Sequence, residues 1–320
     1  MTRLPKAARR TEPVNAGHVL QTWTTARIKT ACHRAWLDYD AAKTKHYTAY
    51  FKAHTELAHP RQAWSAKNIE SALPPGWSDL TNLLPAGRHR EHLSGKSSQI
   101  LALALLGVAA KLDQSHHWLW RAFSPLAPAS ATPPTATFEL EVEASLLGEY
   151  GKKSTSIDYL VKDSGLVISV ECKWREDGLG ACSCPKYGGE PATGACRDVI
   201  RDKRPAYWST AKDVFLLADR TDGQPCPLSP VYQAVRNAAA ALKLSEPDGT
   251  AVFGLIYDAN NPYFSGHGEW PGWPVVLRDA LASTEQPRVW FRAISWQELM
   301  PLLVLDDATR AWAHEKHGLT

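Results

Sequence analysis

The stretch TSIDYLVKDSGLVISVECKW, residues 155–174, has the pattern of a β-hairpin. Both halves are rich in β-branched residues, and a Ser-Gly break at 164–165 separates them. A turn centred on that break places Asp158 directly opposite Glu171. Opposed residues of an antiparallel pair share one face, and Lys173, two positions beyond Glu171, shares it as well. The hairpin therefore predicts two carboxylates and an ammonium group side by side on one face, and an apolar core on the other.

These three charged groups have the chemistry of a metal-dependent site for phosphodiester hydrolysis. Two carboxylates at this spacing raise each other's pKa unless a cation lies between them, and Mg²⁺ is commonly held by one or two carboxylates with waters and phosphate. We expect Asp158 and Glu171 to hold Mg²⁺ or Mn²⁺, with Lys173 contacting the scissile phosphate or helping to orient and deprotonate the attacking water. The competing interpretation is a charged, solvent-facing side of an edge hairpin, which gives no reason for two opposed acids.

The hairpin resembles the PD-(D/E)XK, or restriction-endonuclease-like, nuclease superfamily. Asp158 matches the first acid of that motif, and the Glu-Cys-Lys triplet at 171–173 matches its (D/E)-X-K element. Ile157 stands where the name of the motif has proline. The resemblance covers roughly residues 90–300. It implies an α/β fold with a restriction-endonuclease-like core, in which helices flank a mixed central β-sheet, and it implies DNA as the substrate.

Three further stretches are similar to a group of restriction endonucleases known mainly from their sequences: SSQ at 97–99, CKWRE at 172–176 and YQAVRN at 232–237. By that resemblance Gln233 would be a catalytic residue, and Gln233 and Arg236 would contact the nucleic-acid phosphate or support the metal-bound water. The two residues are spaced i, i+3 and so share a face of the expected helix. The competing interpretation is a solvated helix face.

An additional acidic ligand could come from upstream of the hairpin. The candidates are Glu91, Glu139, Glu141 and Glu143. The last three share one face of the expected strand at 138–146, because apolar and acidic residues alternate along it. The sequence does not choose among the four.

The remaining pattern predicts an α/β domain after a helical N-terminal region. Helices are expected at 17–58, 97–112, 229–244 and from 295 onward, and strands at 138–146, 156–162, 166–174, 251–259 and 288–294. The helix at 97–112 is apolar all round, which is typical of a buried helix. We divide the chain into a helical region at 1–90 and a nuclease core at 91–320, with an irregular Cys/Pro-rich insert at about 175–229.

Four cysteines fall in that insert: Cys182, Cys184, Cys196 and Cys226. Four thiolates could hold a structural Zn²⁺ ion or an iron–sulfur cluster, which some nucleases of this superfamily carry. Only one residue separates the first two cysteines, however, and the later gaps match no standard ligand spacing. Unliganded cysteines are the alternative.

Composition limits the class of protein without selecting the function. The formal net charge of +3 permits a nucleic-acid partner but does not require one, and no apolar run is long enough to span a bilayer. We expect a cytoplasmic, metal-dependent endodeoxyribonuclease of restriction or defence type with DNA as its partner. A homodimer would suit double-strand cleavage. The alternatives are a catalytically inactive nucleic-acid-binding protein on the same fold and an RNA-directed nuclease.

Overall fold

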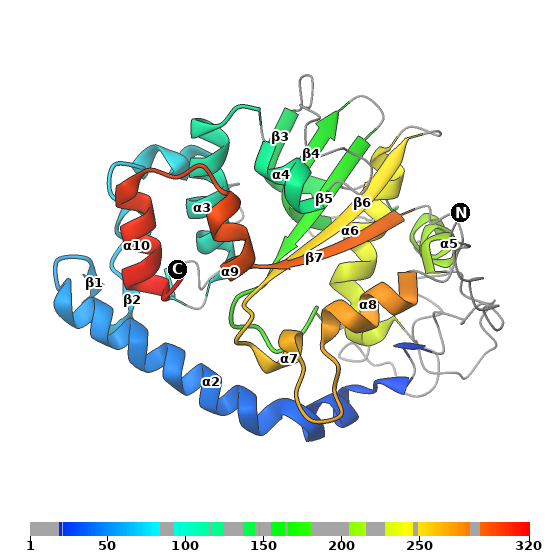
Figure 1. The fold of residues 1–320 in the computed structure, drawn as a ribbon, viewed down its shortest axis with the longest axis horizontal. Helices are drawn as coiled ribbons and strands as arrows, with labels where there is room; N and C mark the ends of the chain where they lie inside the picture. The colour runs from blue at the N-terminus through cyan, green and yellow to red at the C-terminus, as the bar shows by residue number, and fades with distance from the viewer. Residues whose placement is uncertain are drawn as a thin grey trace, which may run out of the picture.

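A computed structural model gives the fold of the 320-residue chain. It describes residues 19–20, 22–83, 93–95, 97–115, 117–123, 137–144, 147, 155–163, 166–180, 205–215, 228–245, 249–281 and 289–320. Within these ranges a five-stranded sheet lies between two layers of helices, and a long N-terminal helix runs past one end of the sheet (Figure 1). The fold is α/β with a mixed sheet, as the sequence predicts.

The central sheet has the strand order β3-β4-β5-β6-β7. Its strands are β3 (Thr137–Ala144), β4 (Thr155–Asp163), β5 (Leu166–Cys172), β6 (Thr250–Tyr257) and β7 (Val289–Ser295). Strand β4 runs antiparallel to both of its neighbours, β3 and β5, whereas β5, β6 and β7 are parallel. The hairpin pairs from Tyr159↔Val170 to Asp163↔Leu166, which is the register expected from the Ser-Gly break. Extending this register by one residue sets Asp158 across from Glu171.

Helices bury both faces of the sheet. On one face, α3 (Ser98–Leu112) and α4 (His117–Phe123) pack over apolar residues that include Tyr159, Ile168 and Val170. On the other face, α6 (Tyr232–Leu244), preceded by the 3₁₀ turn η5 (Ser229–Val231), packs over Leu160 and Val167. Helix α8 (Trp273–Leu281) joins this second layer. The face that carries the charged residues is therefore covered by a helix, and the interpretation as a solvent-facing edge hairpin is wrong.

The predicted buried helix is confirmed as α3, where every residue from Gln99 to Ala110 is buried. Ser97 is its N-cap, and the Ser97 hydroxyl accepts a hydrogen bond from the amide of Ile100 at 3.3 Å. Near the C-terminus, Ser295 caps the short helix α9 (Trp296–Leu299) in a complete capping box with Glu298. The remaining C-terminal elements are α7 (Pro262–Ser265), η6 (Met300–Leu302) and α10 (Asp307–His317).

Two regions contain structure that the sequence pattern does not reveal. The insert at 175–229 holds a helix, α5 (Pro205–Phe215), which packs on α6. In the N-terminal region, helix α2 (Thr25–Ala53) is followed by a two-stranded sheet, β1 (Ala58–His59) with β2 (Gln62–Ala66), and by the 3₁₀ turns η1 (Glu70–Ala72) and η2 (Ser78–Leu83). Turn-forming residues around these short elements obscure their periodicity.

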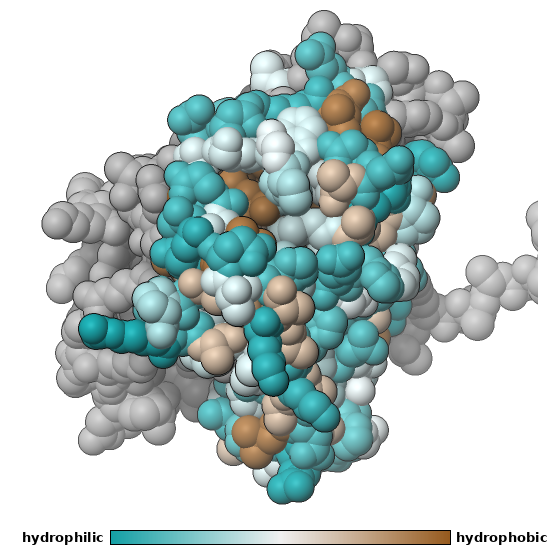
Figure 2. All heavy atoms as spheres, turned by 90° about the vertical axis from the view of Figure 1, so that its left-hand side faces the viewer, coloured by the Kyte–Doolittle hydropathy of each residue, from teal (hydrophilic) through white to brown (hydrophobic). Residues whose placement is uncertain are grey.

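The face formed by α10, β1, β2 and the end of α2 is mainly hydrophilic, and its hydrophobic residues lie in small separate groups (Figure 2). Over the described ranges, the large hydrophobic side chains that are exposed are Leu37, Leu112 and Val304. No helix in the part of the chain that the structure describes has the length and apolar character needed to cross a membrane.

Candidate active site

Asp158, Glu171 and Lys173 meet where β5 ends and α6 covers the sheet. The hairpin register sets Asp158 across from Glu171, and the amide of Cys172 donates a hydrogen bond to Asp158 Oδ2 at 2.7 Å. Glu171 is 1% exposed and Lys173 is 6% exposed, whereas Asp158 is only partly buried. The backbone of Lys173 continues the parallel pairing, because its amide donates to the carbonyl of Ile256 at 2.7 Å. The predicted constellation is therefore present, with one acid deep in the protein and one nearer the surface.

Helix α6 supplies polar groups that contact Glu171 and Lys173. Lys173 Nζ lies 2.7 Å from Glu171 Oε1 and donates a hydrogen bond to Gln233 Oε1 at 3.0 Å. The amide of Asn237, one turn further along α6, donates to Glu171 Oε2. Gln233 and Asn237 face the site because residues at i and i+4 lie on one face of a helix. The structure thus places Gln233 in direct contact with Lys173, and its catalytic role stays a prediction.

Burial and neighbouring charges shift the two pKa values. Burial raises the pKa of Glu171, and the adjacent Lys173 ammonium only partly offsets this effect. Burial alone would lower the pKa of Lys173, but the nearby carboxylates of Glu171, Glu176 and Asp158 outweigh it and raise the pKa overall. Lys173 is therefore a cation at neutral pH.

Gln233 is positioned by the loop that follows β5. The backbone N–H of Gln233 donates a hydrogen bond to the carbonyl of Leu179 at 3.2 Å. The next residue, Gly180, has φ +70°, and a Cβ added there would lie 2.9 Å from Gln233 Oε1. Only glycine fits this close approach without strain. The glycine therefore lets the loop place Gln233 against Lys173.

A third carboxylate, Glu176, belongs to the same surroundings and is absent from the predicted set. Glu176 Oε1 accepts a hydrogen bond from the Ser98 hydroxyl at 2.5 Å, and Oε2 accepts one from the Trp174 amide at 2.6 Å. Its charge acts on both Lys173 and Glu171. The signal in the sequence was the pair of motifs SSQ and CKWRE, which the Ser98–Glu176 contact joins.

The structure also describes Arg236 and the three upstream acids of β3. The guanidinium of Arg236 lies over the ring of Tyr232, 5.3 Å from its centroid, so a contact with nucleic acid stays a prediction. Glu139 is ion-paired with Lys162 at 3.1 Å. The backbone of Glu141 lies between the pairs Leu140↔Tyr159 and Val142↔Ile157 and is therefore across from that of Asp158. In backbone register, Glu141 is thus the upstream acid adjacent to Asp158, and Glu143 pairs with Ser156.

Glu91 and the four cysteines, Cys182, Cys184, Cys196 and Cys226, lie outside the described residues, so a structural metal in the insert stays a prediction. In the described ranges, no three His, Cys, Asp or Glu side chains are arranged as a ready-made metal cage. Asp158 and Glu171 are two opposed carboxylates, and Mg²⁺ is commonly bound by one or two carboxylates beside waters and phosphate.

A sequence model of the family described as "Restriction Endonuclease associating with ARP" matches residues 37–315. The chain belongs to this family. The match contains the whole central sheet and all the site residues described above. No curated protein and no solved structure gives a significant match. Membership of this restriction-endonuclease family indicates a nuclease of restriction or defence type.

Proposed function

We propose that the protein is a metal-dependent endodeoxyribonuclease that hydrolyses phosphodiester bonds at the Asp158–Glu171–Lys173 cluster. The observation that carries the proposal is the convergence of this acid–acid–lysine set with Gln233 in one place, on a sheet whose hairpin register opposes the two acids. DNA as the substrate rests on the family, whose description names restriction endonucleases.

The residues present fit a divalent cation. Glu171 Oε1 is buried and lies 2.7 Å from Lys173 Nζ, and a carboxylate oxygen that makes one such contact still has a lone pair for a ligand. Three carboxylates surround one ammonium group, which leaves an excess of negative charge when all are ionised. Asp158 and Glu171 would hold Mg²⁺ or Mn²⁺, which supplies Lewis acidity to the phosphoryl group and to a bound water.

The chain's own residues would act as follows. Lys173, held as a cation, stabilises the negative charge that develops on the phosphate oxygens. Gln233 orients the Lys173 ammonium, and the Asn237 amide fixes one oxygen of Glu171 so that the other faces Lys173. Because most of these groups are buried, their charges act in a medium of lower dielectric than water and are therefore more effective.

Cleavage assays on linear, circular and single-stranded DNA, with RNA in parallel, test this proposal. Each substrate is incubated with Mg²⁺, Mn²⁺ or EDTA, and Lys173→Ala serves as the control for contaminating nucleases. We expect metal-dependent cutting of DNA that the variant lacks. Preferential cutting of RNA would instead support an RNA-directed nuclease. Binding of DNA without cutting under all conditions would support the inactive binding protein.

A further inference from the structure

The four residues Lys173 to Glu176 form an irregular segment directly after β5, here called the 173–176 segment. Side chains from other elements donate a hydrogen bond to each of its four backbone carbonyls. The donors are Trp296 Nε1 to Lys173 O (3.1 Å), Tyr39 OH to Trp174 O (2.9 Å), Trp36 Nε1 to Arg175 O (3.3 Å) and Asn261 Nδ2 to Glu176 O (2.9 Å). The single proton of the Tyr39 hydroxyl is shared with Asp258 Oδ2 at 2.8 Å, and Asn261 Nδ2 is a second donor to Trp174 O at 3.3 Å. Backbone groups beyond the end of a strand usually form hydrogen bonds with water or within a local turn. Here side-chain donors of the protein reach all four carbonyls.

Side chains of the same segment are fixed as well. Arg175 is 3% exposed, and its Nε donates to Asp40 Oδ1 at 3.0 Å. The indole of Trp174 is fully buried and donates to the hydroxyl of Tyr47 at 2.7 Å. Tyr47 and Asp40 both belong to α2. Side chains of this one helix therefore contact both the side chains and the backbone of the 173–176 segment.

The contacting residues of α2 lie on a single face. Trp36, Tyr39, Asp40, Lys43 and Tyr47 follow the spacing i, i+3, i+4, i+7 and i+11, which recurs on one side of a helix. A helix that merely covered the core would present apolar side chains at these positions. This face presents hydrogen-bonding groups aimed at the segment that carries Lys173 and Glu176.

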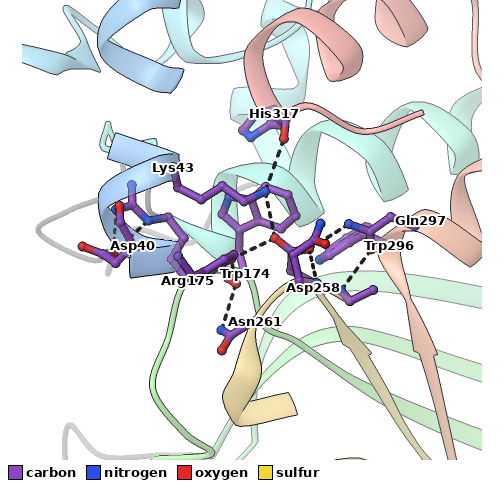
Figure 3. Close-up of polar contacts among 12 residues, drawn as sticks. Asp40, Lys43, Trp174, Arg175, Asp258, Asn261, Trp296, Gln297 and His317 are labelled. Atoms are coloured by element: carbon purple, nitrogen blue, oxygen red, sulfur yellow. Dashed lines mark hydrogen bonds and ion pairs between the residues drawn. The ribbon is translucent and has the colours of Figure 1, made fainter. Parts of the chain in front are cut away.

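An ion pair with low solvent exposure connects this face of α2 to the end of β6. Lys43 Nζ lies 2.8 Å from Asp258 Oδ2 and 3.7 Å from the centroid of a Trp174 ring. Asp258 follows β6, is fully buried, and also accepts a hydrogen bond from Gln297 at 2.7 Å. Figure 3 shows Lys43 reaching between Asp258 and the carbonyl of His317, next to the Trp174 ring.

We propose that α2 is a positioning element of the active site, in which Tyr39 and Trp36 hold the 173–176 segment so that Lys173 and Glu176 keep their places. The inference rests on the proposed function, and it assigns a positioning role to a helix outside the hairpin and α6. Misplacement of a reacting group by about 1 Å can cost about a hundredfold in rate. Beyond the Lys173 amide, which still pairs with the carbonyl of Ile256, the backbone of this segment has no strand ladder to prevent such a shift.

Tyr39→Phe and Trp36→Phe test the proposal, because each removes one donor and keeps an aromatic ring. Arg27→Met is the matched control. It lies on the same helix, and its ion pair with Glu269 (2.9 Å) is exposed and far along α2 from the segment. We expect each aromatic variant to lose at least about tenfold in kcat at saturating Mg²⁺, with the KM for DNA unchanged. The control should keep the wild-type kcat.

Hydrogen exchange of the peptide that contains residues 173–176 gives a readout that does not depend on cleavage. We expect faster exchange there in Tyr39→Phe and wild-type exchange in Arg27→Met. Wild-type kcat and wild-type exchange in both aromatic variants would overturn the inference. A wild-type protein that cuts nothing, with faster exchange still seen in Tyr39→Phe, would overturn the proposed function while supporting the hold of α2 on the segment.

Discussion

Replacing Lys173 by Met removes one partner of a buried ion pair and leaves the other without its counter-charge. At the observed 2.7 Å, the attraction between Lys173 Nζ and Glu171 Oε1 is about 6 kcal/mol at an effective dielectric constant of about 20. Burial of both groups offsets part of this, and breaking such a pair typically costs about 3–5 kcal/mol of stability. We expect a loss in that range for Lys173→Met at pH 8. The matched surface variant Lys162→Met, which breaks the exposed pair with Glu139, should lose less than about 1 kcal/mol.

The loss depends on pH in a direction that the site dictates. Burial already raises the pKa of Glu171 above its ordinary value, and removing the Lys173 cation raises it further. A folded state that binds this proton more tightly than the unfolded state loses stability as pH rises through the raised pKa. The penalty in Lys173→Met should therefore shrink between pH 8 and pH 5.5. In the double variant Lys173→Met/Glu171→Gln, which has neither charge, most of the stability should return at pH 8.

Urea unfolding at 25 °C, followed by tryptophan fluorescence at pH 5.5 and pH 8, measures these differences. Equal slopes with denaturant among the variants would show that the midpoints report stability alone. The reasoning is refuted if Lys173→Met is as stable as the wild type at pH 8. It is also refuted if the loss is the same at both pH values, because Glu171 would then not be the group left unpaired.

Two further results are expected. Gly180→Ala puts a side chain at φ +70° and against Gln233, so it should lower the free energy of unfolding in urea by about 1–2 kcal/mol and lower the cleavage rate. Gly178→Ala, where a new Cβ would meet only ordinary contacts, should change neither quantity. Equal behaviour of the two variants would contradict the role of the loop. Mg²⁺ at a hundredfold excess over its Kd should stabilise the wild type by about 2.7 kcal/mol in thermal unfolding; the same shift in Asp158→Ala would contradict its role as a ligand.

Local sequence is enough to predict those parts of the site that depend on short-range geometry. A two-residue break fixes which residues of β4 and β5 oppose one another, so the meeting of Asp158 with Glu171 follows from the stretch 155–174 alone. Helical spacing similarly predicts that Gln233 and Arg236 share a face of α6. The apolar composition of α3 predicts its burial, because no polar face remains to meet water.

Contacts between distant segments could not be predicted in the same way. Gln233 covers Lys173 from 60 positions further along the chain, so the hairpin alone does not show that its charged face is buried. Ser98 and Glu176 are 78 positions apart, and Tyr39 and Trp174 are 135 apart. Each residue looks like an ordinary helix or loop residue in its own context. The tertiary fold alone brings them together, which is why Glu176 is absent from the predicted site, and why the contacts of α2 were not predicted although the helix itself was.

The central claim is that Asp158 takes part in cleaving DNA, and a pair of single substitutions tests it most directly. Plasmid cleavage in Mg²⁺ is measured for Asp158→Ala beside Glu139→Ala, which removes an acid from the adjacent strand that is paired with a surface lysine. The account predicts that Asp158→Ala loses at least about a hundredfold in rate, because metal-ion catalysis contributes several kcal/mol. Glu139→Ala should cut at the wild-type rate. Cleavage by Asp158→Ala at the rate of Glu139→Ala would contradict the claim.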